Sequence, residues 1–305
     1  MFFALLAAGC RPNEPAPTAG PAPLEVIVSV PPIADLVERI GGENVEVHVL
    51  SSAGACAHRL TLTPRQLVDL GEARLFLLCG MPFEQGVAEK LRAVQRPLQV
   101  IDIARGIPRR RQEAADHDDA HCDAGPECNH EHGHEHDHAH EAAADDPHIW
   151  LAPQHLRTLA GHIAAALVEA DPPRAADYRA RLAALDGQIA AVGQRVERVL
   201  KPLRGQTIYV YHPAFGYLAD AYGLRQKAVE AGGRAPAPRQ LGELIAQARA
   251  DQVRAIFVET QSDPRAAQAV ADAIGCAVVP VDPLAKDALG NLETVAAKLA
   301  GEESL

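Results

Sequence analysis

Short apolar, β-branched runs alternate with segments of helical periodicity along most of the chain, and this alternation limits the possible folds more than any other feature. The predicted strands span residues 24–30, 45–50, 73–78, 98–103, 206–211, 225–229, 254–259 and 276–281. The segments between them show helical spacing of apolar residues. Strands that are joined through helices by short connections form parallel sheets covered on both faces.

A long helical segment separates the first four predicted strands from the last four. Its apolar stripe consists of Leu182, Leu185, Ile189, Val192, Val196 and Leu200. At about 1.5 Å per residue, a helix over residues 175–203 is long enough to cross the whole molecule. We therefore predict an α/β protein of two lobes, each with a mainly parallel sheet flanked by helices, joined by this long helix as a spine.

The predicted boundaries follow from this pattern. The N-terminal lobe spans residues 24–174, the linking helix 175–203 and the C-terminal lobe 204–305. A chain of 305 residues is long enough for two compact lobes.

The first 23 residues do not resemble a folded segment. Residues 1–10 read MFFALLAAGC, which is too short to span a bilayer, since spanning needs about 20 apolar residues. Their end resembles a bacterial lipoprotein cleavage site with Cys10 as the lipidated residue, and residues 11–23 are a Pro-rich tether. The alternative is an arbitrary apolar start. We expect a signal sequence, a lipid anchor at Cys10 as the sole membrane attachment, and a location in the periplasm or at the cell surface.

Residues 113–146 form an insert rich in histidine and acid. Its histidines are His117, His121, His130, His132, His134, His136, His138 and His140. The insert also holds twelve Asp and Glu and no Lys or Arg, so the rest of the chain carries +1 of the total formal charge of −11. Such a composition cannot bury a core and predicts a disordered loop. We interpret it as a weak metal-collecting loop; the alternative is a solvated spacer.

The charge and the cysteines exclude two other classes. Because the body of the chain is nearly neutral, it offers no basic field for nucleic acid. The six cysteines contain no CxxC pair, which argues against a structural zinc knuckle. Cys122 and Cys128 lie in the insert, where metal binding and mutual pairing both stay open.

Four candidate metal ligands stand out: His58, His148, His212 and Asp282. His212 and Asp282 each follow a predicted strand directly, and ligands of open α/β sheets bind at the carboxyl ends of strands. Imidazoles with one carboxylate suit a tetrahedral Zn²⁺ ion. Taken singly, each has an ordinary alternative, such as a helix N-cap for Asp282. His48, His155 and His162 fall inside predicted elements and are interpreted as packing or surface residues.

Several motifs of the chain resemble those of the metal-binding solute receptors of zinc/manganese ABC importers, the zinc-uptake branch in particular. They are AHRLTLTP at 57–64, DPHIW at 146–150, YHPAFGYL at 211–218 with YGL at 222–224, FVE at 257–259 and VDPL at 281–284. The resemblance implies two βαβ-rich lobes bridged by a long helix. It also implies metal ligands at His58, His148 and His212, with Asp282 as the fourth ligand in many members.

Two features of the resemblance point to zinc within that class. Manganese-type members carry a carboxylate where this chain has His212, and zinc-type members often carry a His- and acid-rich loop before the second ligand. The first motif departs from the usual pattern, with Ala57 and Thr61 in place of a proline and an acidic residue. An additional carboxylate ligand there is therefore in doubt, which favours Asp282 or a water as the fourth ligand.

These observations predict a monomeric, non-enzymatic, extracytoplasmic receptor that binds Zn²⁺ with high affinity and delivers it to an ABC-type permease. Metal release is expected to follow from a change in lobe geometry. One alternative is the same scaffold serving manganese or iron, although imidazoles suit zinc better. A zinc hydrolase is the other alternative, and the chain has neither HExxH nor GxSxG.

Overall fold

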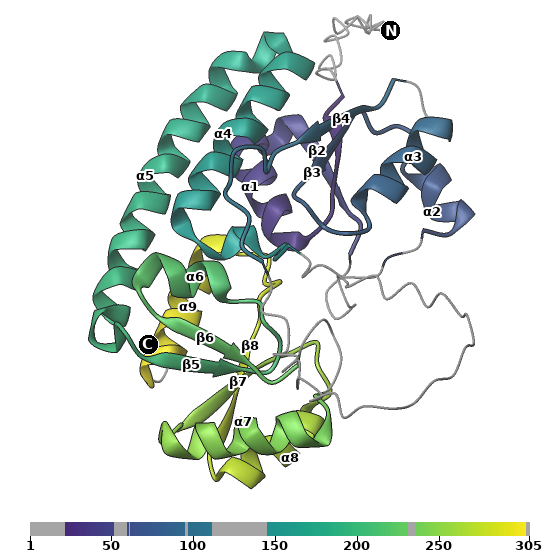
Figure 1. Ribbon diagram of the computed structural model, residues 1–305. Coiled ribbons are helices and arrows are strands. Elements are labelled where there is room, and N and C mark those ends of the chain that lie inside the picture. Colours follow the sequence, from purple (N-terminus) through teal and green to yellow (C-terminus); the bar gives the residue numbers. More distant parts are fainter. Residues whose placement is uncertain are drawn as a thin grey trace, which may run out of the picture.

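The structure is a computed structural model that describes residues 22–51, 60, 62–94, 97–111, 145–230 and 236–302. It confirms the predicted fold class, with two parallel sheets flanked by helices and a long helix beside both (Figure 1). Cys10, the tether as far as residue 21, His58 and the eight histidines of the insert lie outside the described residues. In the described part of the chain, no helix is both long and apolar enough to cross a bilayer.

The N-terminal sheet has the strand order β2-β1-β3-β4, with every pair parallel. Its strands are β1 (Leu24–Val28), β2 (Val45–Val49), β3 (Leu75–Leu78) and β4 (Gln99–Asp102). The helices α1 (Pro31–Gly41), α2 (Pro64–Asp69) and α3 (Glu84–Val94) follow the first three strands in turn. The predicted N-cap of α2 is confirmed, since the Thr63 side chain accepts a hydrogen bond from the Gln66 backbone.

The C-terminal sheet repeats this arrangement in the order β6-β5-β7-β8. Its strands are β5 (Thr207–Val210), β6 (Arg225–Ala228), β7 (Ala255–Glu259) and β8 (Ala277–Val281). Its helices are α6 (Gly216–Tyr222), α7 (Pro238–Ala250), α8 (Pro264–Ile274) and α9 (Ala288–Ala300). In both sheets the chain starts in the second position, steps to one side and then crosses to the other. Each sheet therefore has a switch point at the carboxyl ends of its two central strands, where ligands of such sheets bind.

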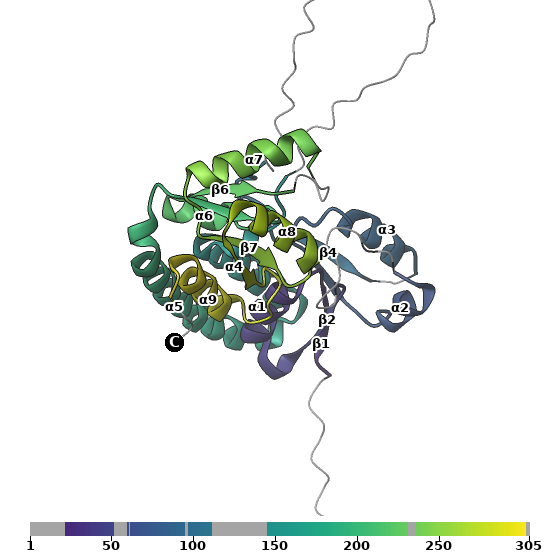
Figure 2. The ribbon, with the colours of Figure 1, turned by 90° about the horizontal axis from the view of Figure 1, so that it is seen from below.

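The helices α4 (Pro153–Ala170) and α5 (Ala175–Leu200) lie side by side along one side of the molecule, away from α2 and α3 (Figures 1 and 2). Five residues of the predicted stripe of α5 are buried and Leu182 is half-buried. A helix of 26 residues is about 39 Å long, which allows α5 to pass both lobes. It packs against α1 of the N-terminal lobe and α9 of the C-terminal lobe.

The largest hydrophobic core is continuous through both lobes. It contains Val26 and Ile33 from the N-terminal lobe, Leu218 and Leu292 from the C-terminal lobe, and the buried stripe of α5. Smaller clusters fill the outer face of each sheet. The two lobes are therefore joined by shared buried surface as well as by the spine helix.

Trp150 reinforces this junction with a hydrogen bond between the lobes. Its indole is 1% exposed, and Nε1 donates to the carbonyl oxygen of Pro283 over 2.7 Å. Nearby, the backbone N–H of Ala288 donates to the Asp35 carboxylate over 3.1 Å. A buried carbonyl that loses its donor costs about 1–3 kcal/mol, so Trp150 contributes both apolar area and a polar contact.

We expect Trp150→Phe to lower the free energy of unfolding by about 2–4 kcal/mol, because it leaves the Pro283 carbonyl without its donor and opens a cavity. The measurement is urea denaturation followed by far-UV circular dichroism, with a metal chelator present so that bound metal does not contribute. Val68→Ala is the control, because the Val68 side chain is 75% exposed, and its effect should stay within about 0.5 kcal/mol. A loss below about 1 kcal/mol for Trp150→Phe would contradict the role given to this contact.

Candidate metal centre

The segment that carries His148 starts where the two ends of the insert meet. Arg111 and Asp145 form an antiparallel β-bridge, and the Asp146 N–H donates to the Arg110 carbonyl over 2.7 Å. Tyr217 of α6 holds both ends, since its hydroxyl accepts from the Arg110 N–H and donates to the Asp146 carbonyl, each over 3.0 Å. The chain thus leaves for the insert and returns at one place, between the lobes.

His148 is buried, at 4% exposure, and is held from two sides. Its Nδ1 lies 2.7 Å from Oδ1 of Asp146, which also accepts from the His148 backbone N–H over 2.9 Å. The ring meets Trp150 edge to face, with centroids 5.5 Å apart. Burial lowers the pKa of His148 and outweighs the opposing effect of Asp146. The imidazole is therefore neutral at physiological pH, as a metal ligand must be.

His212 follows strand β5 at the switch point of the C-terminal sheet. Its Nδ1 lies 2.5 Å from Oε1 of Glu230, and its backbone N–H donates to the buried carboxylate of Glu259 over 3.2 Å. Burial by itself lowers the pKa of His212. The hydrogen bond to Glu230 and the negative charges of Glu259 and Glu230 outweigh that effect, so the net pKa is raised.

The two histidines meet at the interface of the lobes. Their ring centroids are 5.2 Å apart and the ring planes are inclined by 78°. Two imidazoles that share a tetrahedral zinc ion, with Zn–N bonds of about 2.0–2.1 Å, have centroids roughly 5 Å apart. Since a carboxylate accepts from Nδ1–H of each ring, Nε2 is the ligand atom in both cases. The pair therefore has the spacing and the orientation of two ligands to one ion.

Asp282 follows β8 on the same side of the C-terminal sheet, but its carboxylate is engaged elsewhere. Its Oδ1 accepts from Nε2 of Gln261 over 2.7 Å and from the Leu284 N–H over 2.9 Å. In the described part of the chain, the ligand atoms of Asp282, His148 and His212 do not all lie within 4.8 Å of one another. The part of Asp282 as a fourth ligand stays a prediction.

His58 belongs to the connection between β2 and α2, which leaves from the carboxyl end of β2, and it lies outside the described residues. Its role as a ligand also stays a prediction. The two other histidines interpreted as packing residues bond to the backbone. Nδ1 of His155 donates to the Ile149 carbonyl over 3.2 Å, and Nδ1 of His162 to the Ile103 carbonyl over 2.7 Å. Both side chains are half-buried, and the interpretation of His155 and His162 as packing or surface residues stays a prediction.

Sequence reasoning assigned no role to Glu230 or Glu259, the carboxylates around His212. Burial raises the pKa of Glu259, which also accepts from the Ser262 hydroxyl over 3.0 Å. Both glutamates lie at the carboxyl ends of β6 and β7, the strands on either side of β5. The signal that could have found them is their position at strand ends, which His212 and Asp282 share.

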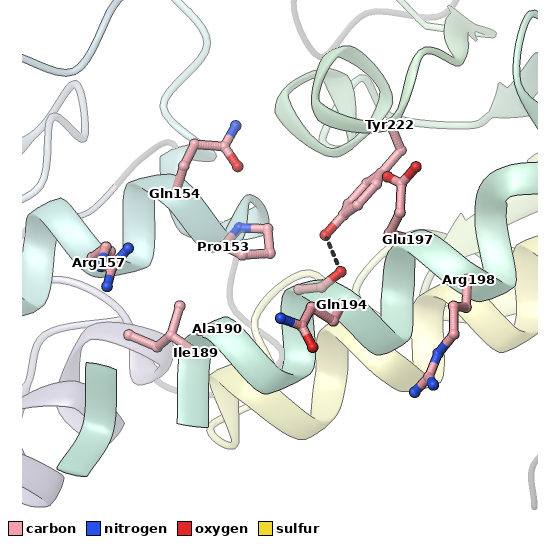
Figure 3. A pocket seen from close by; sticks show the side chains of 10 residues that line it. Pro153, Gln154, Arg157, Ile189, Ala190, Gln194, Glu197, Arg198 and Tyr222 are labelled. Carbon is pink, nitrogen blue, oxygen red and sulfur yellow. Dashed lines mark hydrogen bonds between the residues drawn. The ribbon is translucent and has the colours of Figure 1, made fainter. Parts of the chain in front are cut away.

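A surface groove of about 590 Å³ lies elsewhere, between α4, α5 and α6 (Figure 3). Pro153, Ile189, Glu197 and Tyr222 are among its lining residues, and the Tyr222 hydroxyl donates to the Gly193 carbonyl over 3.3 Å. None of the candidate metal ligands lines it. The groove is therefore separate from the histidine pair.

Comparison with known proteins gives a consistent family. Residues 26–298 match the family described as zinc-uptake complex component A, periplasmic (ZnuA). The high-affinity zinc uptake system protein ZnuA of Paracoccus denitrificans is 31% identical over 260 residues, which cover 80% of this chain and 78% of the relative. A crystal structure of ZnuA shares 33% identity with a TM-score of 0.79, covering 92% of this chain and all of that one. A zinc-bound ZnuA deletion mutant shares 32% identity with a TM-score of 0.79, covering 93% and 99%.

The carboxylate of Glu230 beside His212 predicts how metal affinity depends on pH. A metal must compete with the proton on His212, so affinity falls as the pH drops through the raised pKa of this histidine, beginning above its ordinary value of 6.5. We expect Glu230→Gln to move the onset of this loss to lower pH, because the negative charge that helps to raise the pKa of His212 is gone and a neutral amide oxygen is a weaker acceptor than a carboxylate.

The measurement is zinc affinity against pH, read from the emission of Trp150, the only tryptophan and a neighbour of His148. Glu89→Gln, at an exposed position of α3, is the matched control and should keep the wild-type profile. An onset that does not move in Glu230→Gln would count against the assignment.

Proposed function

The chain belongs to the ZnuA family of periplasmic zinc-uptake components, and from this membership we propose that it is an extracytoplasmic receptor that binds Zn²⁺ and delivers it to an ABC-type permease. The observation that supports this most directly is the pair His148 and His212 between the lobes, with a carboxylate behind each ring. Carboxylates in that position orient histidine ligands and make them more basic.

We propose that His148, His212 and His58 supply three nitrogen ligands, and that Asp282 or a water supplies the fourth. His58 lies in a connection that starts at the carboxyl end of β2, His148 lies just before α4, and His212 and Asp282 follow the carboxyl ends of β5 and β8 in the second sheet. Gln261 and Leu284 both donate to Oδ1 of Asp282, so Oδ2 is the oxygen that would coordinate. Four protein ligands close a zinc shell, as is usual where the metal is held and not used for catalysis.

Zinc is the cargo that this ligand set favours over manganese or iron. Imidazole suits zinc, whereas manganese prefers carboxylate, carbonyl and water. A zinc hydrolase is a weaker alternative, because such an enzyme keeps an open position for water, and the relatives named above are uptake proteins.

Release of the ion is then a matter of local movement. Separating the lobes as rigid bodies would expose the core that runs through both of them and break the hydrogen bond from Trp150 to Pro283. Such exposure costs about 25 cal/mol for each Å² of apolar surface. We therefore propose that the ligand-bearing loops shift to release the ion while the shared core stays intact. This differs from the change in lobe geometry that the sequence predicts.

We propose that the insert collects metal and that the amino-terminal segment anchors the protein to a membrane. The insert begins and ends beside His148, at the bridge between Arg111 and Asp145, so metal gathered on its histidines is released close to the tight site. A lipid at Cys10 would hold the receptor, as a monomer, at a membrane surface in the periplasm or outside the cell.

Removing one ligand tests the proposed site. We expect His58→Ala and His148→Ala each to weaken zinc binding by more than about 100-fold, because loss of an outer-shell partner alone costs about 10–100-fold. Competition with a chelator of known affinity measures the tight site, and a parallel titration with manganese should give weaker binding in the wild type. His162→Gln, whose amide can still donate to the Ile103 carbonyl, should bind zinc as the wild type does. Wild-type affinity in His58→Ala would remove this histidine from the site.

Replacing the insert tests its role. Because Arg111 and Asp145 already pair, residues 113–144 can be exchanged for a short glycine-containing turn without disturbing the fold. The shortened chain should keep the tight zinc ion and lose the weak ones, as counted by elemental analysis after dialysis at low and at high free zinc. Substituting the eight histidines of the insert by serine is the matched variant of full length and should give the same counts. Loss of the tight ion in both variants would show that the insert supplies a ligand.

A further inference from the structure

A second group of metal-ligand side chains lies on the N-terminal sheet, away from the histidine pair. Glu25 of β1 and Glu46 and His48 of β2 place one ligand atom each so that all three atoms lie within 4.8 Å of one another. Among the described residues, this is the one group of three or more His, Cys, Asp or Glu that meets this condition. We propose that Glu25, Glu46 and His48 bind a Zn²⁺ ion.

The register of the two strands brings these side chains together. Glu25 pairs with Glu46, and Ile27 pairs with His48, in the parallel ladder of β1 and β2. The three side chains therefore share one face of the sheet, the face on which Ile27 joins the cluster under α2 and α3. β2 is the edge strand of this sheet, so the corner that these three side chains share is partly open to solvent.

The two carboxylates of this group have no lysine or arginine partner among the described residues. Like charges directly opposite each other on neighbouring strands are destabilising. Within the described residues, neither glutamate forms an ion pair with a lysine or an arginine, and the contact made by Glu25 is with Nε2 of His48. A dication between the two carboxylates would remove this repulsion. His48 is thus more than the packing or surface residue that its place in a strand predicts.

The donor set identifies the class of ion. One imidazole nitrogen and two carboxylate oxygens are ligands that zinc accepts at about 2.0–2.2 Å, with water in the fourth position. Glu25 and His48 are half-buried and Glu46 is exposed, so the ion can exchange with solvent. With three protein ligands, the site binds zinc less tightly than a closed four-ligand shell. Glu25 and Glu46 are the second residues of their strands, near the amino ends, whereas His212 follows the carboxyl end of β5.

The test uses the full chain, with zinc as the probe. Zinc bound per chain is counted after equilibrium dialysis at a free concentration that fills weak sites, for the wild type, Glu46→Gln and His48→Gln. Glu43→Gln, an exposed glutamate just before β2, is the matched control. We expect one zinc ion fewer per chain in each of the two site variants and no change in the control. Glu46 is exposed, so Glu46→Gln keeps the test valid even if His48→Gln fails to fold.

Crystals soaked in zinc chloride locate the ion. The proposal requires an anomalous peak at the zinc edge within about 2.0–2.2 Å of ligand atoms of Glu25, Glu46 and His48. An unchanged zinc count in Glu46→Gln would overturn the proposal, and so would a lower count without a peak at this place, since the ion then lies elsewhere. Neither outcome bears on the proposed receptor function, which depends on His148 and His212.

Discussion

The indole N–H of Trp150 donates a hydrogen bond to the Pro283 carbonyl across the interface of the lobes, and this contact links the segments that carry the candidate ligands His148 and Asp282. The donor is two residues from His148, and the acceptor directly follows Asp282. One buried hydrogen bond thus fixes the distance between two segments that are far apart in the chain. The continuous core around α5 also fixes the position of one lobe relative to the other. A pair of histidines that spans two lobes keeps its spacing only if the lobes do not move freely, and the continuous core opposes such movement.

The two histidines are held in the same way, but their pKa values are shifted in opposite directions. Each ring donates Nδ1–H to a carboxylate, which turns Nε2 toward the interface. Deep burial lowers the pKa of His148, whereas the carboxylates around His212 raise its pKa. As proposed ligands, His148 would be neutral over a wide range of pH, whereas His212 would be protonated first on acidification. The difference arises from the surroundings, since the residue types are the same.

The chain would bind zinc at three kinds of site that differ in how firmly their ligands are positioned. In the histidine pair, His148 is buried and His212 is half-buried, and both are oriented by a carboxylate. The group of Glu25, Glu46 and His48 is positioned by strand register alone and is open to solvent. The insert offers many ligands in a composition that cannot bury a core. Affinity should follow this order, because a preorganised site loses less entropy when it binds.

The sequence by itself determined the elements of this protein and the strand ends that carry the candidate ligands His212 and Asp282. Apolar periodicity is a local property, so it predicted both sheets, the spine helix, and the place of His212 and Asp282 after β5 and β8. Only the tertiary structure decided which groups face each other. Strand order puts Glu230 behind His212, and register puts His48 beside Glu25, which is 23 residues away in the chain. Periodicity tells which face of a strand is buried, but neighbours across strands follow from order and register, and these depend on contacts between distant segments.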